Sequence, residues 1–209
     1  MTPCQAIGAL TALLLGLTAC GGEKPGPAGA RASPFLLSGP ACLAKLADRG
    51  IVTQRWAGGS PGCPVDTPVS AAAGTMIGFE PALQTSCAML VAWSGFEAAV
   101  ERAARDYLRS PVVAIRHFGS FACRRMTGNS VRLSLHAQAR AFDLAGFRLA
   151  DGRIVTVERG WRGTRDEQRF LRAVAAAACR YFSVTLTPDT DRLHYNHLHV
   201  DIGPWRQCG

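Results

Sequence analysis

Six cysteines between residues 42 and 208 constrain the fold of this 209-residue chain more than any other feature. They are Cys42, Cys63, Cys87, Cys123, Cys179 and Cys208, and none forms the C-x-x-C pair that is typical of a structural zinc site. An even number of widely spaced cysteines predicts three disulfides and an oxidising compartment. Of the fifteen possible pairings, we predict Cys42 with Cys63 and Cys123 with Cys179, which leaves Cys87 with Cys208.

The first 33 residues differ in composition from the rest of the chain. Residues 6–19 form an apolar run that is too short to span a bilayer comfortably and resembles a signal-peptide core. The run ends in Leu-Thr-Ala-Cys-Gly around Cys20, which is similar to a bacterial lipobox, where the cysteine is acylated. Residues 20–33 are rich in Gly, Pro and Ala, which indicates a flexible tether. We predict a signal peptide at 1–19, lipidation of Cys20, a tether at 20–33 and a folded domain at 34–209; the alternative for the apolar run is a buried helix.

Hydrophobic periodicity predicts the elements of the folded domain. We expect helices at 41–49, from Pro81 to about Leu108 with a break at Gly95, and at 165–180 behind an N-cap at Thr164. We expect strands at 112–116 and on either side of the Asp151-Gly152 turn. Trp161 could line a groove, but the pattern favours a buried aromatic.

The run from His194 to Asp201 (His-Tyr-Asn-His-Leu-His-Val-Asp) holds three of the five histidines. Alternate side chains of a strand share a face, which predicts that His197, His199 and Asp201 lie on one surface while the aliphatic residues between them face the core. His194 precedes the strand and could fold back over the same surface. Neutral imidazole is the commonest protein ligand for zinc, so the cluster indicates a metal site; the alternative is a polar edge strand in solvent.

Residues 134–143 (Ser-Leu-His-Ala-Gln-Ala-Arg-Ala-Phe-Asp) are the second stretch with metal-binding side chains. His136 and Asp143 are seven residues apart, so a regular strand would place them on opposite faces. They can share a metal only if the chain bends between them, and the three alanines in the interval make a close turn possible. His117, by contrast, stands alone among apolar residues, which favours a structural role.

These two stretches resemble the bacterial extensin-like proteins. The C-terminal domain of that family carries Ser-x-His-Ala-x-x-x-Ala-x-Asp, Gly-Phe, Asp-Gly-Arg, a helix that ends in Cys, and His-x-x-His-x-His-x-Asp, in this order. The matching residues are Ser134, His136, Ala137, Ala141, Asp143, Gly146, Phe147, Asp151, Gly152, Arg153, Cys179, His194, His197, His199 and Asp201. The family is in turn similar to the LAS group of zinc peptidases, which includes D-Ala-D-Ala carboxypeptidases and murein endopeptidases. The resemblance implies an α+β fold of the LAS/hedgehog type, with a small antiparallel sheet, flanking helices and disulfide staples.

The resemblance also implies a role for each matching residue. His136, Asp143 and His199 would bind Zn²⁺, which activates water and polarises an amide carbonyl in such enzymes. His197 would be the general base or proton shuttle, and His194 would stabilise the charge of the tetrahedral intermediate. Ser134 and Asp201 would lie next to the ligands and orient them without binding the metal. Most LAS relatives carry glycine at the position of Ala139.

Three arginines upstream of the first stretch are candidates for substrate binding. Arg124, Arg125 or Arg132 could hold a substrate carboxylate through a bidentate contact, and the alternative for each is a solvated surface charge. We select Arg125 and Arg132.

The charge balance narrows the class of partner. The net charge of +8 favours an anionic partner such as peptidoglycan or another wall polymer, and the absence of a long basic block argues against nucleic acid. We therefore expect a monomeric zinc peptidase of the bacterial cell envelope, anchored through Cys20, facing the periplasm and acting on peptidoglycan stem peptides or cross-links. The alternatives are a non-catalytic wall-binding or structural module of the same fold, and a zinc hydrolase that acts on an ester or a small dipeptide.

Overall fold

The computed structural model describes residues 37–209. The predicted signal peptide, the lipidation site at Cys20 and the predicted tether lie outside the described residues, as do the first three residues of the predicted domain. No helix within the described range is long and apolar enough to cross a membrane.

A mixed sheet forms the centre of the described domain, with strand order β1-β4-β5-β6-β7-β10-β9-β11 and with β8 paired to β7. The strands are β1 (Gln54–Arg55), β4 (Pro68–Ala73), β5 (Gly78–Ser86), β6 (Val112–Gly119), β7 (Ala141–Leu149), β8 (Ile154–Thr156), β9 (Val184–Leu186), β10 (Leu198–Asp201) and β11 (Gln207–Cys208). A separate hairpin joins β2 (Gly59–Ser60) to β3 (Cys63–Pro64). The sheet has nine strands and two parallel pairs, β5 with β6 and β9 with β11, so the prediction of a small antiparallel sheet is corrected. The first parallel pair arises because a helical crossover returns the chain to the same end of the sheet.

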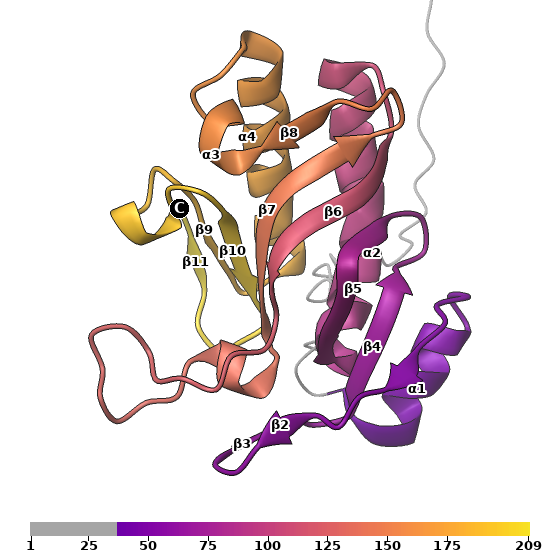
Figure 1. Cartoon of the computed structure of the whole chain (residues 1–209), viewed down its shortest axis with the longest axis vertical. Coiled ribbons are helices and arrows are strands. Elements are labelled where there is room, and N and C mark those ends of the chain that lie inside the picture. The colour runs from indigo at the N-terminus through magenta and orange to yellow at the C-terminus, as the bar shows by residue number, and fades with distance from the viewer. Residues whose placement is uncertain (1–36) are drawn as a thin grey trace, which may run out of the picture. The chain divides into compact units, whose positions relative to one another are not determined.

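Two long helices cover one face of this sheet (Figure 1). These two are α2 (Cys87–Ala103) and α4 (Arg165–Tyr181). The shorter helices are α1 (Gly39–Ala47) and α3 (Val157–Gly160), and the short helical turns are η2 (Ala104–Leu108), η3 (Leu135–Gln138) and η4 (Arg192–His194). Phe142 of β7 meets Trp93 of α2 edge-on at 5.5 Å, and Phe147 meets Phe170 of α4 at 4.9 Å. All four rings are buried, and edge-to-face pairs of this kind add to the burial energy. The core therefore lies between the sheet and α2 and α4, which leaves the other face of β6, β7 and β10 for the polar motifs.

Most predicted elements are confirmed. The first helix, the strand at 112–116, the hairpin around Asp151-Gly152 and the helix behind Thr164 all form, and Thr164 and Glu167 make a reciprocal capping box. Trp161 is buried, as favoured.

The predicted helix from Pro81 is wrong at its start and at its break. Residues 82–86 belong to β5, and α2 begins at Cys87 behind an N-cap at Ser86. Gly95 lies inside an unbroken helix, where a Cβ atom would come within 3.5 Å of the Tyr181 ring. Gly95 therefore does not end the helix, and a Cβ atom there would make only an ordinary contact with Tyr181.

Three disulfides are confirmed, but the predicted pairing is wrong for every pair. The bonds join Cys42 to Cys87, Cys63 to Cys123, and Cys179 to Cys208. The predicted pair of Cys42 with Cys63 does not form because α1 packs across the start of α2, while the β2–β3 hairpin lies beside η3. Tertiary packing, and not distance along the chain, therefore decides the partners.

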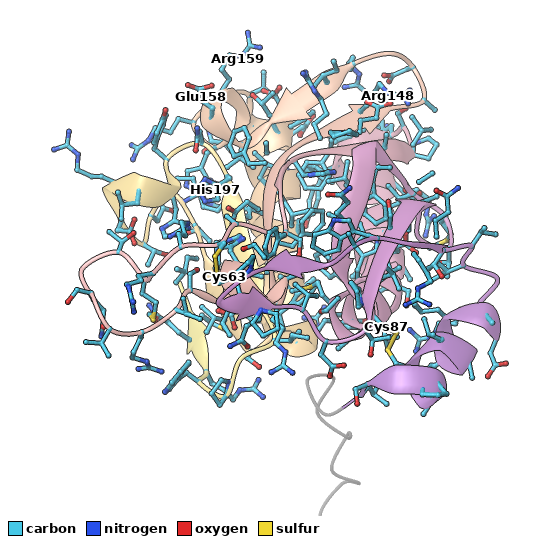
Figure 2. All side chains as sticks on the ribbon, turned by 60° about the horizontal axis from the view of Figure 1, so that its bottom comes forward. Cys63, Cys87, Arg148, Glu158, Arg159 and His197 are labelled. Atoms are coloured by element: carbon cyan, nitrogen blue, oxygen red, sulfur yellow. A yellow bond between two sulfur atoms is a disulfide. The ribbon has the colours of Figure 1, made fainter. Side chains whose placement is uncertain are left out.

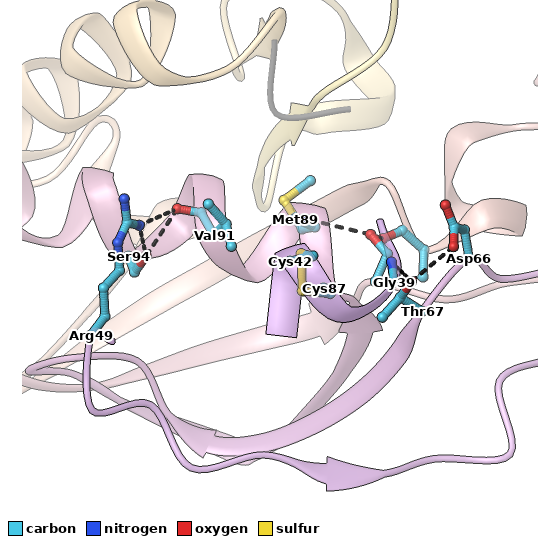
Figure 3. Close-up of a disulfide and its surroundings, with 11 residues drawn as sticks. Gly39, Cys42, Arg49, Asp66, Thr67, Cys87, Met89, Val91 and Ser94 are labelled. Atoms are coloured by element: carbon cyan, nitrogen blue, oxygen red, sulfur yellow. Dashed lines mark hydrogen bonds between the residues drawn. A yellow bond between two sulfur atoms is a disulfide. The ribbon is translucent and has the colours of Figure 1, made fainter. Parts of the chain in front are cut away.

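The Cys42–Cys87 bond fixes the position of α1 on α2 (Figure 3). Both cysteines are fully buried. On one side of the bond, Arg49 donates to the carbonyl of Val91 at 2.9 Å; on the other, the Gly39 amide donates to Thr67 Oγ1 at 2.6 Å. The disulfide thus anchors the start of α2 at a point where hydrogen bonds already hold both ends of α1.

Replacing Cys42 by alanine is expected to free the thiol of Cys87 and no other. The loss of this cross-link should lower the free energy of unfolding by about 2–4 kcal/mol, since the denatured chain regains the freedom of a long loop. Alkylation without reduction, followed by peptide mass mapping, identifies the free thiol, and Cys179→Ala, which should free Cys208, is the matched control. A free thiol at Cys63 in Cys42→Ala would contradict the pairing.

Candidate metal centre

The register between β7 and β10 brings Asp143 and His199 together. These residues are direct partners in the antiparallel pair, and residues that face each other across two strands project to the same side. His199 Nδ1 lies 2.9 Å from Asp143 Oδ1. Leu198 and Val200 are fully buried on the opposite side, so the predicted division of the histidine strand into a polar and an apolar face is confirmed.

A reversal of the chain after η3 brings His136 to the same place. His136 Nε2 lies 3.3 Å from Asp143 Oδ2 and 3.2 Å from His199 Nδ1. The predicted bend is centred on Ala139, whose φ of 51° and ψ of 36° lie in the left-handed region. An L-residue there costs roughly 1–2 kcal/mol relative to a right-handed conformation, and glycine would avoid this cost. The bend between His136 and Asp143 therefore forms with alanine, not glycine, in the left-handed position.

His136, Asp143 and His199 form a possible metal site. One ligand atom of each lies within 4.8 Å of the others. His136 Nδ1 is 3.2 Å from the carbonyl oxygen of Ser120, which directs its Nε2 toward the centre, and His199 Nε2 is 3.4 Å from Asp201, which directs its Nδ1 there. Hydrogen bonds to the far nitrogen of a histidine commonly orient metal ligands in this way. Two imidazole nitrogens and one carboxylate therefore converge, and this donor set fits a divalent metal.

The pKa values of His199 and Asp143 are shifted by the close contacts within the trio of His136, Asp143 and His199. Burial lowers the pKa of His199, but its hydrogen bonds with Asp143 and Asp201 outweigh burial and raise the pKa to about 9. Burial raises the pKa of Asp143, but hydrogen bonds with His136 and His199 outweigh it and hold the pKa well below its usual range. Asp143 is thus a carboxylate at neutral pH, and a metal ion at His199 Nδ1 would replace the proton that this histidine otherwise carries.

His197 lies beside the trio without belonging to it. Its Nε2 is 3.6 Å from Asp143 Oδ1, and its Nδ1 is 2.9 Å from Asn196 Oδ1. Burial is the main reason that its pKa falls to about 4, although the charge of Asp143 opposes the shift. The His197 imidazole is therefore neutral at pH 7 and able to accept a proton.

His194 also reaches the cluster from η4. Its ring lies 5.0 Å from that of His197 and 5.7 Å from that of His199. Its Nδ1 lies 2.7 Å from Asp191 Oδ1. All histidines of the C-terminal motif thus gather around Asp143, and Asp191 orients the outermost of them.

The two arginines selected from the sequence do not contact the trio. Arg125 donates to the carbonyl of Val131 at 2.6 Å, and the Arg132 guanidinium stacks on Trp205 at 4.1 Å. Their role in substrate binding stays a prediction. Ser134 is buried and accepts from the His136 amide at 3.3 Å, so it holds the start of η3.

Sequence reasoning missed the residues that hold the His136 loop from below. The Ala139 carbonyl accepts hydrogen bonds from the Ser86 amide, from Ser86 Oγ at 2.8 Å and from Thr85 Oγ1 at 3.2 Å. Ser120 Oγ donates to the carbonyl of Ala141 at 2.6 Å, and its own carbonyl faces His136. Serine is a favoured N-cap residue, so Ser86 could have indicated a helix that begins at Cys87. The prediction that the helix begins at Pro81 placed Ser86 inside the helix and hid this signal.

Replacing Ser86 by alanine is expected to weaken both the fold and the metal site. The variant loses the cap of α2, where Ser86 Oγ accepts from the Met89 amide, together with the bond to Ala139. We expect a loss of about 1–2 kcal/mol in the free energy of unfolding, together with weaker zinc binding, because the bend before Asp143 loses its support. Urea unfolding and zinc titration measure the two effects. Thr156→Ala removes the cap of the short α3 and is the control: zinc affinity that falls equally there would contradict a specific role for Ser86.

His117 is not part of the possible metal site. Its Nε2 lies 2.8 Å from the carbonyl of Pro81, and its ring packs edge-on against Phe79 and Phe142. Burial is the main reason that its pKa is lowered. The packing is consistent with the structural role predicted for this histidine.

Comparison with known proteins agrees with the two motifs. The family model described as "Extensin-like protein C-terminus" matches residues 40–209. No significant match was found among curated proteins or among solved structures. The matched range includes every residue of the trio, His194 and His197, and all six cysteines of the three disulfides. The chain therefore belongs to the family of extensin-like proteins, of which it carries the C-terminal domain.

Proposed function

We propose that this protein is a zinc metallopeptidase of the bacterial cell envelope that hydrolyses amide bonds in peptidoglycan stem peptides or cross-links. The observation that carries the proposal is the convergence of His136, Asp143 and His199 within 4.8 Å. Two imidazoles and a carboxylate match the three protein ligands typical of catalytic zinc. This proposal includes kinship with the LAS-type peptidases and a lipid anchor on Cys20.

The residues around the trio supply the functions that amide hydrolysis needs. Zinc bound there would acidify a water molecule and polarise a carbonyl. His197 lies 3.6 Å from Asp143 and is neutral at pH 7, so it is the residue placed to take a proton from the attacking water and return it to the leaving amine. His194, held by Asp191, lies close enough to the cluster to face negative charge that develops on the substrate oxygen.

The composition supports the envelope and its polymer as the setting. Three disulfides persist in oxidising compartments such as the periplasm. The net charge of +8 attracts an anionic polymer and raises the rate of encounter with it.

Digestion of purified peptidoglycan tests the proposal. Zinc-loaded protein should release soluble fragments whose masses identify a cleaved peptide bond, and a chelator should stop the release until zinc is restored. Arg169→Gln, on the exposed surface of α4, serves as a control for changes in charge alone. Binding to the polymer without any release of fragments would contradict the proposal and favour a non-catalytic wall-binding module.

A further inference from the structure

A cavity of about 340 Å³ lies next to His197, on the face of the sheet that carries His136, Asp143 and His199. Its lining includes Phe118 of β6, Ala145 of β7 and Asn196 of the histidine loop. Ala145 follows Asp143 by two residues, so it projects to the same side about 7 Å farther along the strand. Asn196 and Phe118 both contact His197, the first through its Oδ1 at 2.9 Å and the second edge-on at 5.8 Å. Two residues of the cavity wall therefore contact His197 directly.

Two walls of the cavity carry opposite charges. Arg116 of β6 and Thr156 of β8 both pair with Gly146 of β7 in register, so their backbones lie two strand spacings, about 10 Å, apart. Arg116 lines the first wall, and Glu158, two residues beyond Thr156, lines the second. In the view of Figure 2, His197 lies between Cys63 and Glu158, so the acidic wall is on the side away from the β2–β3 hairpin.

Neither Arg116 nor Glu158 forms an ion pair within the described residues. Glu80, which also lines the cavity, receives two hydrogen bonds from Arg148, at 2.9 Å and 2.6 Å, and this pair neutralises itself. The Arg148 hydrogen bond has the larger effect in lowering the pKa of Glu80, and Arg116 helps to lower it through its charge, but Arg116 and Glu80 are more than 4.0 Å apart. A guanidinium prefers a carboxylate partner, and a carboxylate prefers an ammonium partner. The cavity thus presents a guanidinium and a carboxylate, neither of them in an ion pair, to a ligand that carries a carboxylate and an ammonium group.

We infer that this cavity is a specificity pocket for a peptide side chain that ends in both an ammonium and a carboxylate group. Arg116 binds the carboxylate, Glu158 binds the ammonium group, and Phe118 and Ala145 contact the aliphatic stem. A diamino-dicarboxylate residue such as meso-diaminopimelate in a peptidoglycan stem has this chemistry. The inference rests on the proposed function for the choice of peptide class, and the charges of the pocket select among the stems of that class.

Binding of three tripeptides to the chelator-treated protein tests the pocket without any turnover. The probes are a stem tripeptide with meso-diaminopimelate at its third position, the same peptide with lysine, which lacks the carboxylate, and the same peptide with 2-aminopimelate, which lacks the ammonium group. Calorimetry on the wild type should show the first peptide bound about tenfold to a hundredfold more tightly than either of the others, because each loses one charge-assisted contact.

Single substitutions should remove one preference each. Arg116→Gln should lose discrimination against the lysine peptide, Glu158→Gln should lose discrimination against the aminopimelate peptide, and Arg169→Gln should keep both. Equal binding of the three peptides to the wild type, or preferences that survive in both pocket variants, would overturn the inference. Discrimination without release of fragments from peptidoglycan would leave the pocket standing and refute hydrolysis; release without discrimination would refute the pocket alone.

Discussion

The His136→Ala variant is expected to bind zinc far more weakly and, at zinc concentrations that only saturate the wild type, to lose hydrolysis of peptidoglycan. The His136 Nε2 atom lies within 3.3 Å of both Asp143 and His199, so its removal takes one of three ligands from the centre. Loss of a residue that only supports a ligand weakens metal binding by about 10–100-fold. The loss of a ligand should therefore weaken it by more than about a hundredfold, which competition with a chromophoric chelator can measure.

Two further variants set the scale of this effect. Asp201→Asn should fall in the 10–100-fold range, because Asp201 orients His199 without being a ligand itself. Asp189→Asn makes the same chemical change at an exposed carboxylate that pairs with Arg172, and it should leave zinc affinity unchanged. If His136→Ala binds zinc as tightly as the wild type, His136 is not a ligand and the proposed centre is wrong.

The His197→Gln variant is expected to bind zinc normally and to hydrolyse peptide bonds about 10²–10⁴-fold more slowly. A positioned proton carrier contributes a factor of this size, and glutamine cannot exchange a proton at neutral pH. His197 lies 3.6 Å from Asp143 but outside the trio, so the ligands remain in place.

Single-turnover rates and zinc titration on the same variant show whether His197 is a metal ligand or a proton carrier. A fall in zinc affinity as large as that of His136→Ala would mean that His197 is a ligand. A rate within tenfold of the wild type, with zinc still bound, would mean that another group carries the proton.

The candidate site could be predicted from the sequence because its signals are local. The alternation of the histidine strand fixes which side chains share a face with His199, and the odd spacing of His136 and Asp143 requires a bend, which Ala139 provides. These conclusions depend on strand geometry alone. The direct pairing of Asp143 with His199 across β7 and β10 then completes the trio, and no single segment could have shown it.

The disulfides and the sheet could not be predicted in the same way because they depend on long-range packing. Cys42 finds Cys87 because α1 lies across the start of α2, and β5 lies beside β6 because α2 crosses over between them. The start of α2 was placed too early, since Pro81 resembles a helix opener while residues 82–86 extend β5. The supporting role of Ser86 was lost with that error.

X-ray absorption at the zinc edge of the zinc-loaded protein tests most directly the claim that His136, Asp143 and His199 hold the metal. The account predicts one zinc per chain, bound by two imidazole nitrogens and carboxylate oxygen, with one imidazole lost in His136→Ala and none lost in His197→Gln. A spectrum with sulfur ligands, or one that loses an imidazole in His197→Gln and keeps both in His136→Ala, would contradict it.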